Sequence, residues 1–212
     1  RAAVVDPELT LDLPREVTAS TGLDALTQLI EPYISVRANA LTDMFCTEGM
    51  QRVRRSLRSV FRDGHDADAR NDMSFAALLG GLALANAGLG VVHGFAAPVG
   101  GMYPAPHGSV CAAILPHGFE VNLRAVRNRA PERLERFATV ARVLTGRDDA
   151  EPEHAVEWLL ELCSDLEIPG LAHWGVTDSP ELVDKAARAN SMNANPVVLS
   201  GEELAAVLHA SL

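Results

Sequence analysis

The sequence predicts an all-α fold, and three observations support this prediction. Hydrophobic residues make up 48% of the 212 residues, which is enough for a sizeable core, whereas aromatic residues make up only 5%. Alanine and leucine are abundant, which favours helices over sheets. Apolar positions recur with the 3.6-residue period of amphipathic helices. We therefore expect one helical bundle domain over residues 14–212.

Residues 1–13 differ from this pattern. The segment Ala2-Ala-Val-Val5, followed by Asp6-Pro7, is typical of a short strand that ends in a turn. Such a strand needs pairing partners from another part of a sheet. We therefore expect residues 1–13 to be the last strand of, and the joint to, a separate domain.

The helical pattern begins after Pro14 and continues past Tyr33. A second helix is expected to end at Asp63-Gly64, with a polar loop over 65–72 and an apolar helix over 73–86 after it. Ser179-Pro180 and Ser200-Gly-Glu-Glu203 are good start signals for the last two helices. The later helices are expected at 107–118, 131–145, 152–166, 180–192 and 201–211.

Charge and cysteine content exclude several classes of function. The net charge of −10 argues against nucleic acid or an anionic membrane as a partner. We find no signal peptide and no uninterrupted apolar run long enough to span a bilayer. The three cysteines form no CxxC pair and are expected to be reduced core thiols in a cytoplasmic protein: Cys46, Cys111 and Cys163.

Two histidines, His93 and His107, bracket a glycine-rich stretch. Histidine is a common metal ligand, and glycine lets the backbone come close to a site. Upstream, Asp24 and Gln28 lie four residues apart and so on one side of the expected first helix. One carboxylate and two imidazoles are enough to hold a divalent metal with positions left open for substrate.

These residues also have plainer interpretations, which the sequence leaves open. Asp24 and Gln28 could be an ordinary surface pair, although the apolar residues around Asp24 favour burial. His93 could be a core histidine bonded to a carbonyl group, and His107 a helix-start residue. His117, like His173, has proline or glycine close by and could line a cleft.

At these positions the chain resembles the iron-containing alcohol dehydrogenases. The similar motifs follow the family's order and span nearly the whole chain: Val4-Val-Asp-Pro-Glu-Leu-Thr10, Asp24-Ala-Leu-Thr-Gln-Leu-Ile-Glu31, Gly90-Val-Val-His93-Gly, Pro106-His107-Gly108, Ile114-Leu-Pro-His117 and Asn195-Pro196. The resemblance implies the C-terminal, helical metal-binding half of a two-domain enzyme with a fold similar to dehydroquinate synthase. It also implies that an N-terminal α/β domain holds NAD(P), and that the first motif is the joint between the two domains.

In that family an aspartate and three histidines hold Fe²⁺ or Zn²⁺ between the domains. The resemblance assigns Asp24, His93 and His107 to this ligand set, with Gln28 at the position of the remaining histidine. Because a glutamine offers only a neutral amide oxygen, metal binding is expected to be weaker than in typical members. The metal would act as a Lewis acid on an alcohol or aldehyde oxygen, and hydride would pass to or from the nicotinamide.

A second departure is Ala97, where the family often has a histidine with a proton-transfer role. Proton transfer would then fall to water, a ribose hydroxyl or His117. The resemblance thus makes His107, as a metal ligand, and His117, as a proton-transfer candidate, the expected catalytic residues. Dimerisation or higher assembly is a further expectation from the family.

Three functions remain open at this stage. The favoured one is the metal-binding half of an NAD(P)-dependent alcohol dehydrogenase that acts on a small alcohol or aldehyde. Because the chain has neither a G-x-G-x-x-G motif after a strand nor the family's Gly-Gly-Gly-Ser stretch, we expect no turnover without the N-terminal domain. The alternatives are a metal-independent reductase similar to the maleylacetate reductases, and a non-catalytic helical binding module. The module would be favoured if the three expected ligands were exposed and more than about 10 Å apart, since ligands of one metal each lie roughly 2 Å from it.

Overall fold

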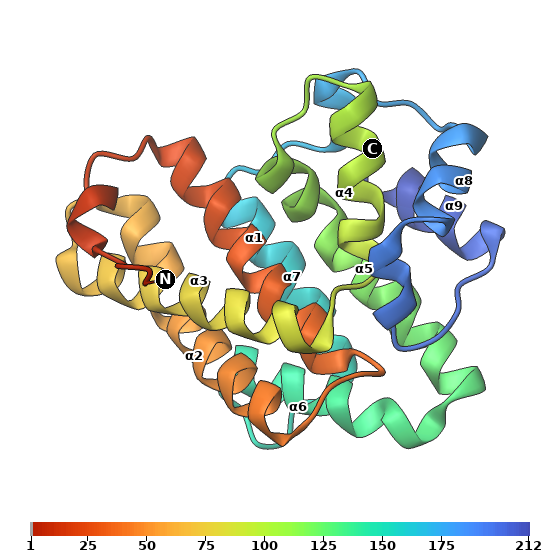
Figure 1. Ribbon diagram of the computed structural model, residues 1–212, viewed down its shortest axis with the longest axis horizontal. Helices are drawn as coiled ribbons and strands as arrows, with labels where there is room; N and C mark the ends of the chain where they lie inside the picture. Colours follow the sequence, from red (N-terminus) through yellow and green to blue (C-terminus); the bar gives the residue numbers. More distant parts are fainter. Residues whose placement is uncertain (1) are drawn as a thin grey trace.

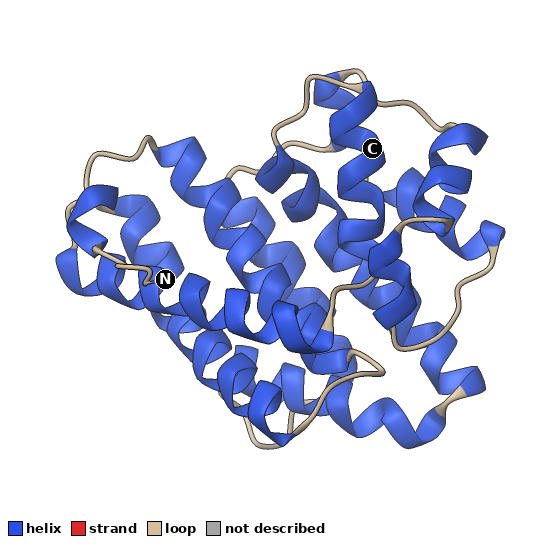
Figure 2. Cartoon of the chain, in the orientation of Figure 1, coloured by secondary structure: helices blue, strands red, loops and turns tan. Residues whose placement is uncertain are grey.

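The computed structural model describes residues 2–212, and all regular secondary structure in that range is helical (Figures 1 and 2). This confirms the predicted all-α class. Short 3₁₀ helices cover Pro7–Thr10, Pro131–Arg133, Leu171–Trp174 and Asn190–Ala194. The α-helices are α1 (Arg15–Ile34), α2 (Ala40–Arg62), α3 (Ala67–Ala87), α4 (Val91–Met102), α5 (His107–Arg129), α6 (Leu134–Thr145), α7 (Pro152–Asp165), α8 (Pro180–Ala187) and α9 (Gly201–Ala210).

The predicted strand at the start of the chain does not form. No strand is assigned anywhere in residues 2–212, so Ala2–Val5 has no neighbour to complete a hydrogen-bond ladder. A 3₁₀ helix follows instead, and the Asp6 side chain caps it by accepting the backbone N–H of Glu8 at 3.0 Å. Val4 and Leu9 remain exposed.

Helix boundaries differ from the prediction in the middle of the chain. The expected polar loop over 65–72 is mostly part of α3, because the Asp66 side chain accepts the N–H of Ala69 and starts the helix early. The expected break near Pro116 is also wrong: α5 continues to Arg129. Most of α5 is buried around this proline, so packing offsets the hydrogen bond that proline cannot donate.

Later boundaries are closer to the prediction. α8 is shorter than expected and ends at Ala187, after which residues 190–194 form a 3₁₀ helix. The start signals are confirmed: the Ser179 hydroxyl accepts the N–H of Leu182, and Ser200 with Glu203 forms a reciprocal capping box.

The turn from α3 to α4 directs the chain back into the core. Gly88 has φ +74°, a conformation that glycine adopts without steric cost, and the two helices meet at 101°. No single helix in residues 2–212 is both long and apolar enough to cross a bilayer, although α3 and α4 together pass that test as a bent pair. The turn places α4 against α5 and α8.

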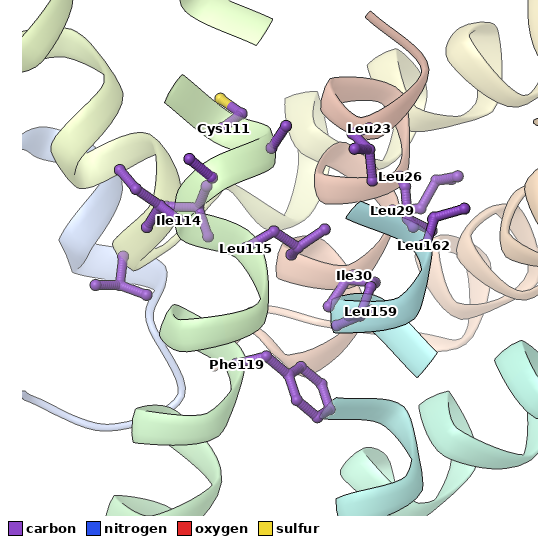
Figure 3. Close-up of a cluster of buried hydrophobic side chains, with 14 of the residues drawn as sticks. Leu23, Leu26, Leu29, Ile30, Cys111, Ile114, Leu115, Phe119, Leu159 and Leu162 are labelled. Atoms are coloured by element: carbon purple, nitrogen blue, oxygen red, sulfur yellow. The ribbon is translucent and has the colours of Figure 1, made fainter. Parts of the chain in front are cut away.

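Helices α1, α2 and α3 lie side by side and form one group. Helix α5 packs against α1 of this group and also against α4 and α7 (Figure 1). Figure 3 shows side chains of α1, α5 and α7 meeting in the core, each nearly or fully inaccessible to water: Leu23, Leu26, Leu29, Ile30, Ile114, Leu115, Phe119, Leu159 and Leu162. Each such side chain contributes roughly 1.5–3 kcal/mol by leaving water.

One glycine allows α5 to begin directly beside α1. A Cβ atom added at Gly108 would lie 2.7 Å from the carbonyl oxygen of Ser20. Only glycine therefore permits this approach without a shift of one helix. The contact sets the start of α5 one turn from Asp24 of α1, where the candidate site forms.

Candidate metal centre

Helix α1 contributes three polar side chains from one face. Asp24, Gln28 and Glu31 follow one another at intervals of four and three residues, which places them on successive turns. The Gln28 amide nitrogen donates to Oδ2 of Asp24 at 2.9 Å. The Glu31 carboxylate is buried, and it accepts the backbone N–H of Val92 at 2.7 Å through Oε1.

Helix α4 presents His93 to this face from its first turn. The free N–H groups at the start of α4 are held by Glu31 and by Asn195, whose Oδ1 accepts from Val91 at 3.1 Å. Nδ1 of His93 lies 2.7 Å from Oε2 of Glu31, and Nε2 lies 3.3 Å from Oδ1 of Asp24. The two edges of the ring therefore face two carboxylates, and the side chain is only 9% exposed.

Helix α5 brings the remaining groups. His107 is its first residue, and Nε2 lies 3.7 Å from Oδ1 of Asp24. Cys111 follows one turn later, with Sγ 3.6 Å from Nε2 of His107 and 3.9 Å from Nε2 of His93. The His107 side chain is 55% exposed, whereas Cys111 is buried, so the site opens to solvent on the His107 side.

Burial and charge shift the pKa values of these groups strongly. Burial of His93 would lower its pKa, but contacts with Asp24, Cys111 and Glu31 outweigh this effect and raise it to about 12. Burial would raise the pKa of Asp24, yet its contacts with His93 and the charge of His107 hold it below its ordinary value. Burial raises the pKa of the Cys111 thiol to about 12.

One oxygen in this cluster lacks a partner. Oδ1 of Asp24 is buried and makes no properly directed hydrogen bond to any of the described residues, although His93 lies 3.3 Å away. An unpaired buried carboxylate oxygen is costly and calls for a cation or a donor. Oδ1, the two Nε2 atoms and the Cys111 Sγ all lie within 4.8 Å of one another, so the donor set fits a divalent metal ion.

The structure brings together three of the residues that the sequence singled out. Asp24, His93 and His107 converge from α1, α4 and α5, and the wide separation that would indicate a non-catalytic module is not found. Gln28 lies beside them, bonded to Asp24. His117 lies ten residues beyond His107 on α5, roughly 15 Å along the helix axis, and does not join the group.

Two members of the site are not among the predicted site residues. Glu31 ends the motif that begins at Asp24 and has no predicted role, although its place seven residues after Asp24 puts it on the same face of α1. Cys111 is predicted as a core thiol, and it is indeed buried, but its position four residues after His107 places its sulfur beside that ring. Both spacings were visible in the sequence.

Comparisons with known proteins show the family of the chain. The family model described as "Fe-containing alcohol dehydrogenase family, C-terminal" matches residues 18–212. Alcohol dehydrogenase 4 of Saccharomyces cerevisiae (strain ATCC 204508 / S288c) is 36% identical over 209 residues, which are 97% of this chain and 53% of the yeast protein. The chain thus spans about half the length of that relative.

Solved structures show the same relationship. A crystal structure of 1,3-propanediol oxidoreductase superposes with a TM-score of 0.90 and 34% identity, over 98% of this chain and 55% of the other. Maleylacetate reductase from Rhizobium sp. strain MTP-10005 superposes with a TM-score of 0.82 and 26% identity, over 97% of this chain and 55% of the other. The chain therefore belongs to the iron-containing alcohol dehydrogenase family and contains the family's C-terminal domain.

Proposed function

We propose that this chain is the metal-binding half of an NAD(P)-dependent dehydrogenase that interconverts a small alcohol and its aldehyde. The observation that carries the proposal is the convergence of Asp24, His93 and His107, with a buried carboxylate oxygen left unpaired at their centre. Family membership adds the reaction class, since relatives include alcohol dehydrogenase 4 of yeast and 1,3-propanediol oxidoreductase.

The chain's own residues would hold and orient the ion. When bound, a divalent ion such as Fe²⁺ or Zn²⁺ supplies Lewis acidity to a substrate oxygen. Glu31 fixes the His93 ring through Nδ1 and leaves Nε2 free to ligate, and Gln28 orients Asp24. Because His107 is half exposed, the substrate oxygen would approach from that side.

The dinucleotide would come from a second domain. Because the chain spans about half of its relatives, NAD(P) binding is assigned to the part of those proteins that it does not cover. The exposed Val4 and Leu9 are suited to an apolar contact at a joint with such a domain. We therefore propose that the isolated chain does not oxidise alcohol.

Proton transfer would not use position 97, because Ala97 has no titratable group. Ala97 lies one turn after His93 and is exposed, so water can reach this position. Water or a ribose hydroxyl of the dinucleotide is the simplest carrier. His117 would take part only through intervening molecules, because it lies well along α5 from His107.

A metal-independent reductase is the second candidate. The observation that favours it is Gln28, a weak neutral donor at one of the expected ligand positions. The likeness to the Rhizobium maleylacetate reductase adds support. In that case the cluster of Asp24 and His93 would be a buried ion pair with a structural role.

Metal content and turnover of the purified chain separate these outcomes. The chain would be loaded with Zn²⁺ or Fe²⁺, freed of excess metal by gel filtration, and supplied with NAD(P)⁺ and a short primary alcohol. We expect one bound ion per chain and no turnover. Bound metal well below one ion per chain would favour the reductase, and turnover by the chain alone would contradict the need for a second domain.

A further inference from the structure

The Gln28 side chain is held by Asp24 through its amide nitrogen. Its amide nitrogen donates to Oδ2 of Asp24, the oxygen that faces away from the histidines, at 2.9 Å. The only other polar atom of this side chain is a neutral amide oxygen, a weak donor toward Zn²⁺ or Fe²⁺. Gln28 is therefore placed as a positioning residue that orients Asp24, and one ligand position is left to another group.

Cys111 is the further member of the cluster that can fill a ligand position. It lies one turn after His107 on α5, and its sulfur is close to Nε2 of both histidines, at 3.6 and 3.9 Å. In Figure 3 it stands at one end of the core cluster, with its sulfur pointing away from the leucines of α1. The Cys111 side chain is fully buried, so the sulfur is presented to the site and not to solvent.

The separations match those of ligands around one tetrahedral ion. Metal–nitrogen and metal–oxygen distances near 2.0–2.1 Å, with a metal–sulfur distance near 2.3 Å, place neighbouring ligand atoms roughly 3.3–3.6 Å apart. Each histidine Nε2 lies 3.3 or 3.7 Å from Oδ1 of Asp24 and 3.6 or 3.9 Å from Sγ of Cys111. Small side-chain rotations would close the difference.

An ordinary core thiol explains these contacts less well. A thiol has one weak proton to donate, yet Oδ1 of Asp24 and Nε2 of both histidines all lie within 4.8 Å of the Cys111 sulfur. A hydrogen bond from this thiol to either histidine would still leave Oδ1 of Asp24 without a partner among the described residues. A cation at the centre satisfies all four groups together.

We propose that Cys111 is a fourth protein ligand of the metal, joining Asp24, His93 and His107 in place of the amide at position 28. The proposal rests on the proposed function, since it requires that the site bind a divalent ion. On coordination the Cys111 thiol and Nε2 of His93 would each release a proton to solvent, so that the sulfur binds as thiolate and the imidazole binds through its lone pair. The site would then be a mixed nitrogen, oxygen and sulfur site, a donor set that suits Zn²⁺.

Cobalt(II) absorption tests this assignment without any measurement of activity. The metal-free chain would be titrated with Co²⁺ as wild type, Cys111→Ser and Cys163→Ser. Cys163 is the matched control because it too is largely buried, but its sulfur donates to the backbone oxygen of Ala112 and is absent from the cluster. Circular dichroism would verify that each variant is folded.

We expect a thiolate-to-cobalt charge-transfer band in the near ultraviolet for wild type and Cys163→Ser. Cys111→Ser should lose this band, keep weaker visible d–d bands, and bind Co²⁺ at least about tenfold less tightly, since even outer-shell changes cost 10- to 100-fold. Binding of Co²⁺ by wild type without the band, or a band that persists in Cys111→Ser, would overturn the role of Cys111 alone. Failure of wild type to bind Co²⁺ would overturn the proposed metal function and this inference together.

Discussion

The carboxylate of Glu31 lies 2.7 Å from Nδ1 of His93, on the ring edge opposite the nitrogen that faces Asp24. Glu31 and His93 come from α1 and α4, and the second Glu31 oxygen accepts the N–H of Val92. One buried side chain therefore fixes both the start of α4 and the orientation of its histidine ring, and with a metal bound at Nε2 it would accept the proton that remains on Nδ1.

Glu31→Gln should weaken metal binding while keeping the fold. The glutamine oxygen can still accept from Val92, but its NH₂ group would face Nδ1 and favour the tautomer that carries the proton on Nε2. Loss of an outer-shell carboxylate typically costs roughly 10- to 100-fold in affinity. Competition with a chelator measures this change. Unchanged affinity in Glu31→Gln would contradict the role given to Glu31, and Glu120→Gln, at a site elsewhere on α5, is the control.

The metal-free chain should lose stability as the pH rises above neutrality. The His93 pKa is raised from 6.5 to about 12 in the folded state, so its stabilisation is complete below about 6.5 and declines as the pH rises toward 12. The lowered pKa of Asp24 works in the other direction, and its contribution is lost in acid. The free energy of unfolding, measured with urea at pH 6 and pH 9, should fall more in wild type than in His93→Gln. An equal fall of the free energy of unfolding in both proteins would show that the pKa of His93 is not raised on folding.

Gly108→Ala should destabilise the fold and disturb the site together. The added Cβ would lie 2.7 Å from the carbonyl oxygen of Ser20, so α5 would have to move away from α1 and carry His107 with it. Overpacking of this kind costs about 1–3 kcal/mol. Gly81→Ala is a matched control, because nothing lies within 4 Å of its added Cβ and alanine is the better helix former by about 0.5–1 kcal/mol. Thermal melting should move the two variants in opposite directions; a Gly108→Ala variant as stable as wild type would contradict the close contact.

The three thiols should be slow to react in the folded, metal-free chain. Burial raises the pKa of each of them from 9.0 to about 12, so little thiolate is present at pH 8. Disulfide-exchange reagents should modify them slowly in buffer and promptly in denaturant. If Cys46, Cys111 or Cys163 reacted equally fast in both conditions, that thiol would be more accessible than the structure shows.

Local signals predicted helix starts well, because they depend on a few neighbouring residues. Ser179 and Ser200 cap their helices as expected, each through its hydroxyl. Predictions failed where contacts with the rest of the fold decide the outcome. Pro116 lies inside α5 because its neighbours are packed on several sides, and Ala2–Val5 is not a strand because no strand lies beside it among the described residues.

The site was predictable to the extent that spacing and family motifs identify residues from separate segments. Asp24, His93 and His107 were identified in this way, and the structure places them together. The roles of Glu31 and Cys111 depend on how α1, α4 and α5 are packed against one another, which no single segment specifies. These contacts between helices could not be predicted from the sequence of any one helix.

The most direct test of the central claim is calorimetric titration of the metal-free chain with Zn²⁺. Wild type should bind one ion per chain, and His93→Ala should lose this binding. His209→Ala is the control, because His209 is exposed, pairs with Asp178 and does not belong to the cluster. If His93→Ala binds one Zn²⁺ as tightly as wild type, the three helices do not form the metal site described above.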